Sequence, residues 1–194
     1  MKKIGFVCEG ETEIGLLGSD MFKDLLNEMN LESVGEFDAG GRDKLLTKDE
    51  DLEKKFKILN DKAAEKIFIL SDLENDPCIS YYKERLFDYS SLTKNIVAVK
   101  AIEAWLLSDS TTLSVLLKKR FYYDYPENTD VLPMNKLQEI FLKETGRGLG
   151  IGYKKPRIMK KFVRNGFTLD GAAEHPQCSS VKYFLKKLEE FSKE

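Results

Sequence analysis

The sequence predicts an α/β protein, in which a mostly parallel sheet of about four strands is flanked by helices and followed by a helical C-terminal part. Three observations support this prediction. Apolar runs of strand length recur at 3–8, 66–72 and 95–99, segments with helical spacing lie between them, and only helical patterns follow after about residue 109. Strands that are apolar throughout, without polar alternation, are typical of a parallel sheet covered on both faces.

The first half of the chain is expected to alternate strands and helices. The strand at 3–8 (KIGFVC) leads into a turn at Glu9 and Gly10 and then into a helix over about 13–29, which Glu11 or Thr12 can cap. The other elements expected before residue 110 are a strand at 32–38, a helix at 51–64, a strand at 66–72, a helix at 81–89 and a strand at 95–99.

The second half is expected to be helical. The apolar spacing predicts helices over 111–120, 135–145, 156–163 and 180–191, and Ser179 and Ser180 are expected to cap the last of them. We therefore predict an α/β core over 1–109 and a helical extension over 110–194 that packs on this core.

Composition excludes several classes of protein. The chain has 194 residues, of which 42% are hydrophobic and 33% charged, as in soluble globular domains. It has no apolar stretch of the ~20 residues that a membrane span needs and no signal-peptide pattern, so a cytoplasmic location is expected. Three widely spaced cysteines and a single histidine, His175, argue against a zinc enzyme with several histidine ligands. We expect His175 to lie in a loop.

Charge is distributed unevenly along the chain. Residues 1–99 carry 14 Lys and Arg against 21 Asp and Glu, a net charge of −7, and residues 100–194 carry 17 against 12, a net of +5. An acidic half joined to a basic half suits a metal-dependent enzyme that acts on a polyanion. Two unrelated solvated surfaces would give the same distribution, so charge alone favours neither interpretation.

Acidic residues follow two of the predicted strands. Glu9 comes after the first strand, and Asp72, Glu74 and Asp76 come after the strand at 66–72. In a parallel sheet the ligand crevice lies beyond the carboxyl ends of the strands, so these carboxylates are expected to meet there. Mutually repelling carboxylates are costly unless a cation neutralises them, and oxygen ligands suit Mg²⁺ or Mn²⁺. The alternative is that the acids only cap helices.

Other residues near these motifs have two interpretations each. Glu13 is four residues from Glu9, so a helix that starts at the turn would place both near one face. Glu103, in AIEAW, is either a second-metal ligand or a helix cap beside a buried Trp105. Lys100 and Arg42 either contact a phosphate or pair with the acids.

The segment 153–164 (YKKPRIMKKFVR) contains six basic residues and no acid, with aromatic residues interleaved. Such a segment can bind phosphates and stack on bases, and Lys154, Lys155 and Arg157 are the candidates for phosphate contacts. A helix whose apolar side packs inward while its lysines stay in water is the alternative.

Four motifs occur in an order and spacing that resemble a Toprim-like domain. They are FVCEGETE, FDAGGRDK, FILSDLEND and VAVKAIEAWLLSD, and the tail CSSVKYFLKKL resembles the closing segment of a small, stand-alone Toprim-like family. The resemblance covers nearly the whole chain. It extends to the Toprim domain of topoisomerases, primases and overcoming-lysogenisation-defect (OLD) type nucleases, in which a glutamate after the first strand and a DxD-type pair after the third serve metal-dependent chemistry. Here the second position of that pair is Glu74 instead of Asp.

The resemblance, together with the acids and the basic segment, defines the candidate site. The catalytic candidates are Glu9 and Lys100, the metal ligands are Glu9, Glu13, Asp72, Glu74, Asp76 and Glu103, and the substrate-binding residues are Gly10, Arg42, Ser71, Lys154, Lys155 and Arg157.

The function expected from these features is a Mg²⁺- or Mn²⁺-dependent phosphodiester hydrolase, a nuclease acting on DNA or RNA in anti-phage defence. The resemblance also allows a homodimer or a partner protein of a defence system. The alternative is a non-catalytic Toprim-like module that binds nucleic acid or protein. A third interpretation, phosphoryl or nucleotidyl transfer to a small molecule, uses the same metal site.

Overall fold

The computed structural model describes residues 1–149 and 155–194, except for the side chain of Lys155. Four parallel strands form one sheet in the order β2-β1-β3-β4. The strands are β1 (Lys2–Cys8), β2 (Leu31–Asp38), β3 (Lys66–Asp72) and β4 (Thr93–Ala98). The predicted α/β class with a parallel, four-stranded sheet is thus confirmed.

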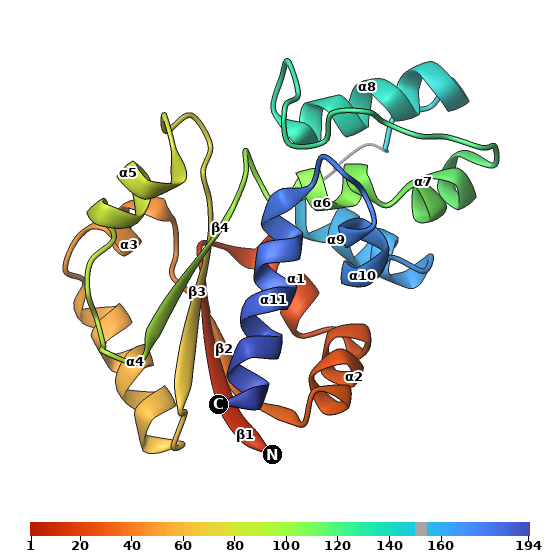
Figure 1. The fold of residues 1–194 in the computed structure, drawn as a ribbon. Coiled ribbons are helices and arrows are strands. Elements are labelled where there is room, and N and C mark those ends of the chain that lie inside the picture. The colour runs from red at the N-terminus through yellow and green to blue at the C-terminus, as the bar shows by residue number, and fades with distance from the viewer. Residues whose placement is uncertain (150–154) are drawn as a thin grey trace.

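Helices flank the sheet on both faces (Figure 1). They are α1 (Glu11–Leu17), α2 (Asp20–Glu28), α3 (Arg42–Leu46), α4 (Glu50–Asp61), α5 (Ile79–Arg85), α6 (Glu103–Ser108), α7 (Ser110–Leu117), α8 (Pro133–Thr145), α9 (Lys155–Arg164), α10 (Leu169–Ala173) and α11 (Ser179–Lys193). None of the helices in the described part of the chain is both long and apolar enough to span a membrane.

The two faces of the sheet have separate hydrophobic cores. Phe6 of β1 packs into a cluster with residues of α1, α2 and α11, whereas Val7 packs into a second cluster with residues of α3 and α4. Successive side chains of a strand point to opposite faces, so a strand buried on both faces must be apolar at every position. Gly5 leaves room for Leu59 of α4, because a Cβ at this position would lie 2.7 Å from the Leu59 side chain.

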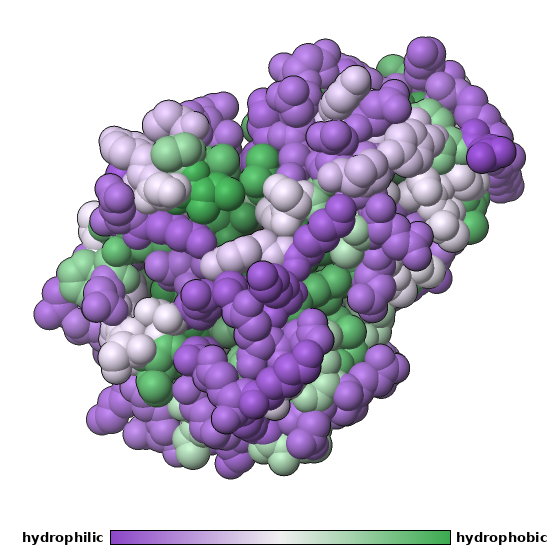
Figure 2. Space-filling view, in the orientation of Figure 1, coloured by the Kyte–Doolittle hydropathy of each residue, from purple (hydrophilic) through white to green (hydrophobic). Residues whose placement is uncertain are grey.

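The last helix is part of the main core. Phe184 of α11 stacks on Phe22 of α2 at 6.0 Å and on Trp105 of α6 at 5.7 Å. At the other end of α11, Lys2 Nζ donates to the carbonyl oxygen of Phe191 at 2.9 Å. One hydrophobic cluster therefore joins residues from both 1–109 and 110–194. Figure 2 shows that hydrophilic side chains cover most of the molecular face seen there, with hydrophobic side chains in patches between them.

Some predicted elements differ from the observed ones. The single helix expected over 13–29 is wrong, because the chain breaks at Gly18 and Ser19, where Ser19 Oγ accepts from Phe22 N at 3.2 Å and starts α2. The helix expected at 81–89 starts and ends earlier, at Ile79–Arg85, and the short helices α3 and α10 were not expected.

The start of α11 is also capped differently from the prediction. Ser179 and Ser180 lie inside the helix, and the carboxylate of Glu127, from a distant loop, accepts from their backbone N–H groups at 2.8 and 2.7 Å. A carboxylate at this end of a helix is favoured by the helix dipole.

Candidate functional site

Glu9 and Asp72 meet at the carboxyl edge of the sheet. They follow the adjacent parallel strands β1 and β3, and the backbone N–H of Asp72 donates to Glu9 Oε2 at 3.1 Å. Asp72 Oδ1 accepts from the backbone N–H of Ile102, just before α6, at 2.8 Å. The two carboxylates are thus oriented by backbone groups of elements that the sheet fixes, as a rigid site requires.

A pocket of about 310 Å³ opens beside these two carboxylates. It is lined by Glu9, Gly10, Glu11, Thr12, Glu13, Gly41, Asp72 and Pro156. Pro156 belongs to the first turn of α9, which packs against α1: a Cβ on Gly15 would lie 3.8 Å from the Met159 side chain. The acidic edge of the sheet therefore adjoins the start of the most basic helix in the chain.

Glu13 has a structural contact that explains its position in the EGxTE sequence. Its side chain is 4% exposed, and its Oε2 accepts from the N–H of Gly10 at 3.2 Å, which satisfies the backbone donor at the N-cap of α1. Glu13 thereby fixes the turn that follows Glu9.

The acids of the loop after β3 are paired with arginines. The Arg42 guanidinium donates to the carbonyl oxygen of Asp72 at 3.0 Å and to Glu74 Oε2 at 3.3 Å, and it forms an ion pair with Asp76. Asp76 also bonds to Arg85 at 2.8 Å. Of the two roles considered for Arg42, the contacts in the structure are those of pairing with acids.

Tyr82 of α5 was not singled out from the sequence, yet it lies beside the site. It is fully buried, and the Arg42 guanidinium sits 4.3 Å from its ring centre. Burial raises the pKa of Tyr82 to about 12; the hydroxyl of the buried Ser71 lowers it, and the charges of Glu9 and Asp72 raise it. The sequence carries no chemical signal for Tyr82, because its placement depends on how α5 folds back over the sheet.

The field at this edge is negative. Burial raises the pKa of the Cys8 thiol well above its usual value, and the charges of Glu13, Asp38 and Glu36 raise it further. Cys8 is fully buried and directly precedes Glu9. A cation approaching the pocket would therefore be attracted by carboxylates other than Glu9 and Asp72 as well.

The remaining site candidates occupy the turn after β4 and the start of α6. Lys100 adopts a left-handed conformation, with φ of 63°, and its carbonyl oxygen accepts from Glu74 N at 2.7 Å. Glu103 is the first residue of α6 and is 1% exposed, one position after the Ile102 N–H that binds Asp72. The backbone of this turn thus bonds both to the Asp72 carboxylate and to the backbone N–H of Glu74.

Of the three basic candidates, only Arg157 can be located in full. It lies exposed on the first turn of α9, one position after Pro156. Lys154 lies outside the described residues, as does the side chain of Lys155.

The carboxylates at this edge of the sheet suit Mg²⁺ better than a metal that takes all of its ligands from the protein. Among residues 1–149 and 155–194, no group of three or more His, Cys, Asp or Glu side chains is arranged to hold a metal ion. Mg²⁺ commonly binds through one or two carboxylates and completes its shell with water and substrate phosphates. Glu9 and Asp72 are two carboxylates at neighbouring strand ends, which is the number of protein ligands that such a site uses.

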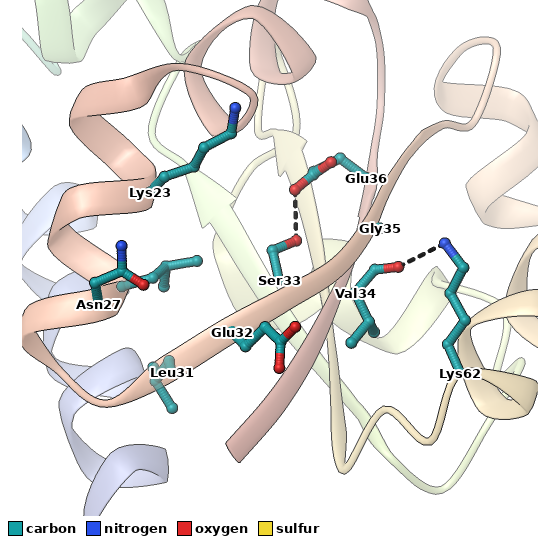
Figure 3. A pocket seen from close by; sticks show the side chains of 10 residues that line it. Lys23, Asn27, Leu31, Glu32, Ser33, Val34, Gly35, Glu36 and Lys62 are labelled. Carbon is teal, nitrogen blue, oxygen red and sulfur yellow. Dashed lines mark hydrogen bonds between the residues drawn. The ribbon is translucent and has the colours of Figure 1, made fainter. Parts of the chain in front are cut away.

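A different pocket, of about 470 Å³, runs along the free edge of β2 between α2 and α4 (Figure 3). Its polar groups bond to one another: Lys62 Nζ donates to the carbonyl oxygen of Val34 at 2.8 Å, and Ser33 Oγ to Glu36 Oε1. A lysine over an edge carbonyl is a common way to protect an open strand from pairing. This pocket lacks the converging strand ends of the Glu9 and Asp72 site.

His175 belongs to the helical part of the chain, distant in sequence from Glu9 and Asp72. Its hydrogen bonds are those of a neutral imidazole. It is 3% exposed, its Nδ1 accepts from Gln177 N at 3.1 Å, and its Nε2 therefore donates to the carbonyl oxygen of Tyr123 at 2.9 Å. Burial lowers the pKa of His175. Its contacts are those of a structural residue in a loop.

Comparison with protein-family models, curated proteins and solved structures gives no match to this chain. The relation to Toprim-like proteins thus depends on the four sequence motifs and remains a proposal.

Proposed function

We propose that this protein is a Mg²⁺-dependent phosphodiester hydrolase that cleaves nucleic acid at the pocket beside Glu9 and Asp72. One observation carries the proposal: the backbone N–H of Asp72 bonds to the Glu9 carboxylate at 3.1 Å, so the two acids adjoin at the carboxyl edge of a parallel sheet. That edge is where α/β proteins bind their ligands. The Toprim-like motifs support the same assignment of Glu9 and Asp72.

Each residue has a proposed role. Glu9 and Asp72 would hold the metal, which when bound neutralises phosphate charge and lowers the pKa of a water. Glu9 would accept the proton of the attacking water at a carboxylate oxygen. Ile102 N orients Asp72 through their 2.8 Å bond, and Arg42 anchors the backbone of the loop that follows.

The contacts of Asp76 leave it out of the proposed ligand set. It already bonds to Arg85 at 2.8 Å and pairs with Arg42, and its side chain is only 11% exposed. Releasing it to a metal would take one acidic partner from Arg42, which would keep Glu74, and would break the bond to Arg85. Glu74 is 46% exposed at its side chain, so it remains able to reach a metal or a substrate-bound water.

The alternative function, a binding module without catalysis, is favoured by the same ion pairs. With Glu74 and Asp76 beside Arg42, the DxD-type pair of the Toprim resemblance is partly neutralised by protein charge. Such a module would bind its partner without magnesium.

Thermal unfolding in a magnesium titration separates the two functions. If the site is that of a magnesium-dependent enzyme, added Mg²⁺ should raise the melting temperature. A ligand at ten times its Kd stabilises the fold by about 1.4 kcal/mol, which corresponds to about 3–5 °C in a domain of this size. Glu9→Gln should abolish both this shift and nuclease activity. Glu11→Gln is the matched control, because Glu11 lines the same pocket but is exposed on α1. Equal shifts in both variants, or none in the wild type, would remove the metal site from the proposal.

A further inference from the structure

A second cationic surface lies in the helical part of the molecule. Lys118, Arg147 and Lys161 line a groove of about 500 Å³, together with Leu116, Leu117, Phe141, Glu144, Thr145 and Gly148. The three cations come from the end of α7, the loop after α8, and α9, helices that group together at the upper right in Figure 1. We call this surface the basic groove.

The basic groove carries a net positive charge. Its one acidic residue among the described lining, Glu144, forms an ion pair with Lys119, so its charge is already compensated. Within residues 1–149 and 155–194, none of Lys118, Arg147 and Lys161 makes a salt bridge with a carboxylate. Lys161 instead lies 5.0 Å from the centre of the Phe141 ring.

Lys118 occupies a backbone conformation that lysine disfavours. It ends α7 with φ of 56° and ψ of 33°, the left-handed region where Gly or Asn is usual. A non-glycine residue in this conformation costs roughly 1–2 kcal/mol. From this position at the end of α7, the Lys118 side chain lines the groove.

Arg147 is presented by an ordered loop. Gly146 ends α8 with φ of 66°, Thr145 Oγ1 accepts from Arg147 N at 3.1 Å, and Leu149 N donates to Gln138 Oε1 at 3.0 Å. These bonds fasten the loop to α8 on both sides of Arg147. The backbone that carries Arg147 is therefore held in place at the groove.

Helix α9 connects the basic groove to the acidic pocket. Pro156 lines the pocket beside Glu9 and Asp72, and Lys161 lines the groove five residues later. At 1.5 Å per residue, the two positions are about 7 Å apart along the helix axis. Five residues also turn the helix by about 140°, so a phosphate chain that leaves the pocket must pass partly around α9 to reach the groove, a path of several nucleotides at about 3.4 Å each.

From this arrangement we infer that the basic groove binds the sugar-phosphate backbone of a polynucleotide, at phosphates that flank the phosphodiester in the acidic pocket. The inference deepens the proposed function and rests on it for the location of cleavage, because it says where the phosphates that flank the cleaved bond are held.

Binding to a short labelled strand, measured by fluorescence anisotropy in EDTA so that no cleavage occurs, tests the inference. The affinity of the wild type should fall steeply between about 50 and 200 mM salt. The triple variant Lys118→Asn, Arg147→Gln and Lys161→Gln should flatten the slope of log K against log salt by roughly 2–3, at about 0.7 to 0.9 for each phosphate that the variant no longer neutralises. The matched control replaces Lys54, Lys57 and Lys186 with Gln, which removes the same charge from exposed positions of α4 and α11.

Single-stranded DNA and RNA form separate arms, and poly-glutamate serves as an acidic peptide competitor. Strand binding that resists the competitor and loses slope only in the groove variant supports the inference. Equal slopes in the groove and control variants overturn it, and so does displacement of the strand by an equal charge of poly-glutamate. Failure of the proposed function would appear differently: Glu9→Gln would cleave like the wild type while the groove still bound the strand.

Lys118→Asn alone provides a second measurement. Asn tolerates the left-handed conformation better than Lys, so the melting temperature should stay the same or rise, while the salt slope flattens by about 0.7 to 0.9. A rise in stability with an unchanged slope would show that the Lys118 side chain has no part in binding.

Discussion

Two groups of acids follow the strands of this sheet, and their surroundings differ. Glu9 and Asp72 accept hydrogen bonds from backbone N–H groups, at 3.1 and 2.8 Å, whereas Glu74 and Asp76 bond to the guanidinium groups of Arg42 and Arg85. Backbone donors orient a carboxylate without cancelling its charge. Arginine cancels the charge and restrains the loop.

The comparison teaches that acids close together in sequence can serve opposite purposes. In SDLEND, the strand ends at Asp72, and the chain then turns through Glu74, whose φ of 51° is left-handed. Asp72 stays at the sheet edge facing the pocket, and Asp76 is carried over to Arg42 and Arg85.

Replacing one acid of each group in turn should give the largest difference in magnesium-dependent cleavage. Asp72→Asn keeps an oxygen for the Ile102 N–H but removes a metal ligand, so magnesium-dependent cleavage should fall by about a hundredfold or more. Asp76→Asn should leave the magnesium dependence intact and lower stability instead, because two arginines lose a partner. Cleavage rates over a magnesium series, with urea unfolding of each variant, measure both effects. Equal loss of cleavage in both variants would mean that the two groups of acids act as one site.

Removing Arg42 should have the next largest effect. Its side chain is only 17% exposed, and Arg42→Ala removes the arginine partner of Glu74, one of the two arginine partners of Asp76 and the cation over the Tyr82 ring. We expect a loss of about 2 kcal/mol in the free energy of unfolding. In a double-mutant cycle with Asp76→Asn, the combined loss should be about 1 kcal/mol smaller than the sum of the single losses. An additive cycle would show that the ion pair contributes nothing to stability.

The smallest effect expected is the contribution of Tyr82 to the pH dependence of the free energy of unfolding. Tyr82 contacts Arg42, and the charges of Glu9 and Asp72 act on its hydroxyl. Its pKa is raised to about 12 in the folded state, from 10 unfolded, so the unfolded chain loses the proton first. The stability from the neutral phenol is complete below pH 10 and is lost as pH rises through 10 to 12, with about 1 kcal/mol lost at pH 11.

Tyr82→Phe tests this expectation, because it keeps the ring under Arg42 while removing the titrating hydroxyl. Urea unfolding at pH 8 and pH 11 should show a smaller loss of stability in the variant than in the wild type. The same loss in both proteins would assign the alkaline transition to other groups, such as Tyr89 or Tyr123, whose pKa values burial also raises.

The strands could be predicted from the sequence because burial on both faces leaves a local signature. The observed β3 matches the predicted 66–72 at both ends, and Glu9 and Asp72 were expected at one edge because parallel strands share a direction. The meeting of these two acids therefore follows from two short apolar runs and a rule of topology.

Partners that arrive from distant segments could not be predicted in the same way. Glu127 caps α11 from about fifty residues away, and Arg42 reaches Asp76 across thirty-four positions. From the sequence, Ser179 and Ser180 were predicted to cap α11 because they are the nearest side chains that can do so. Arg42 had two candidate roles, and the sequence did not decide between them. The break at Gly18 was overlooked because the apolar spacing continues across it, while Ser19 offers a cap to α2.

The bond between Lys2 and Phe191 joins positions 189 residues apart, and Figure 1 shows the two marked ends of the chain near each other. Phe6 of the first strand and Phe184 of the last helix both contact Phe22 and Phe68, so the aromatic cluster also joins the two ends of the chain. Topologies dominated by such distant contacts fold slowly, because loop entropy is lost before the contacts form. Adjacent ends also make circular permutation feasible: a short linker between them, with new ends in an exposed loop, would turn the most distant contact of this fold into a local one and should speed its folding.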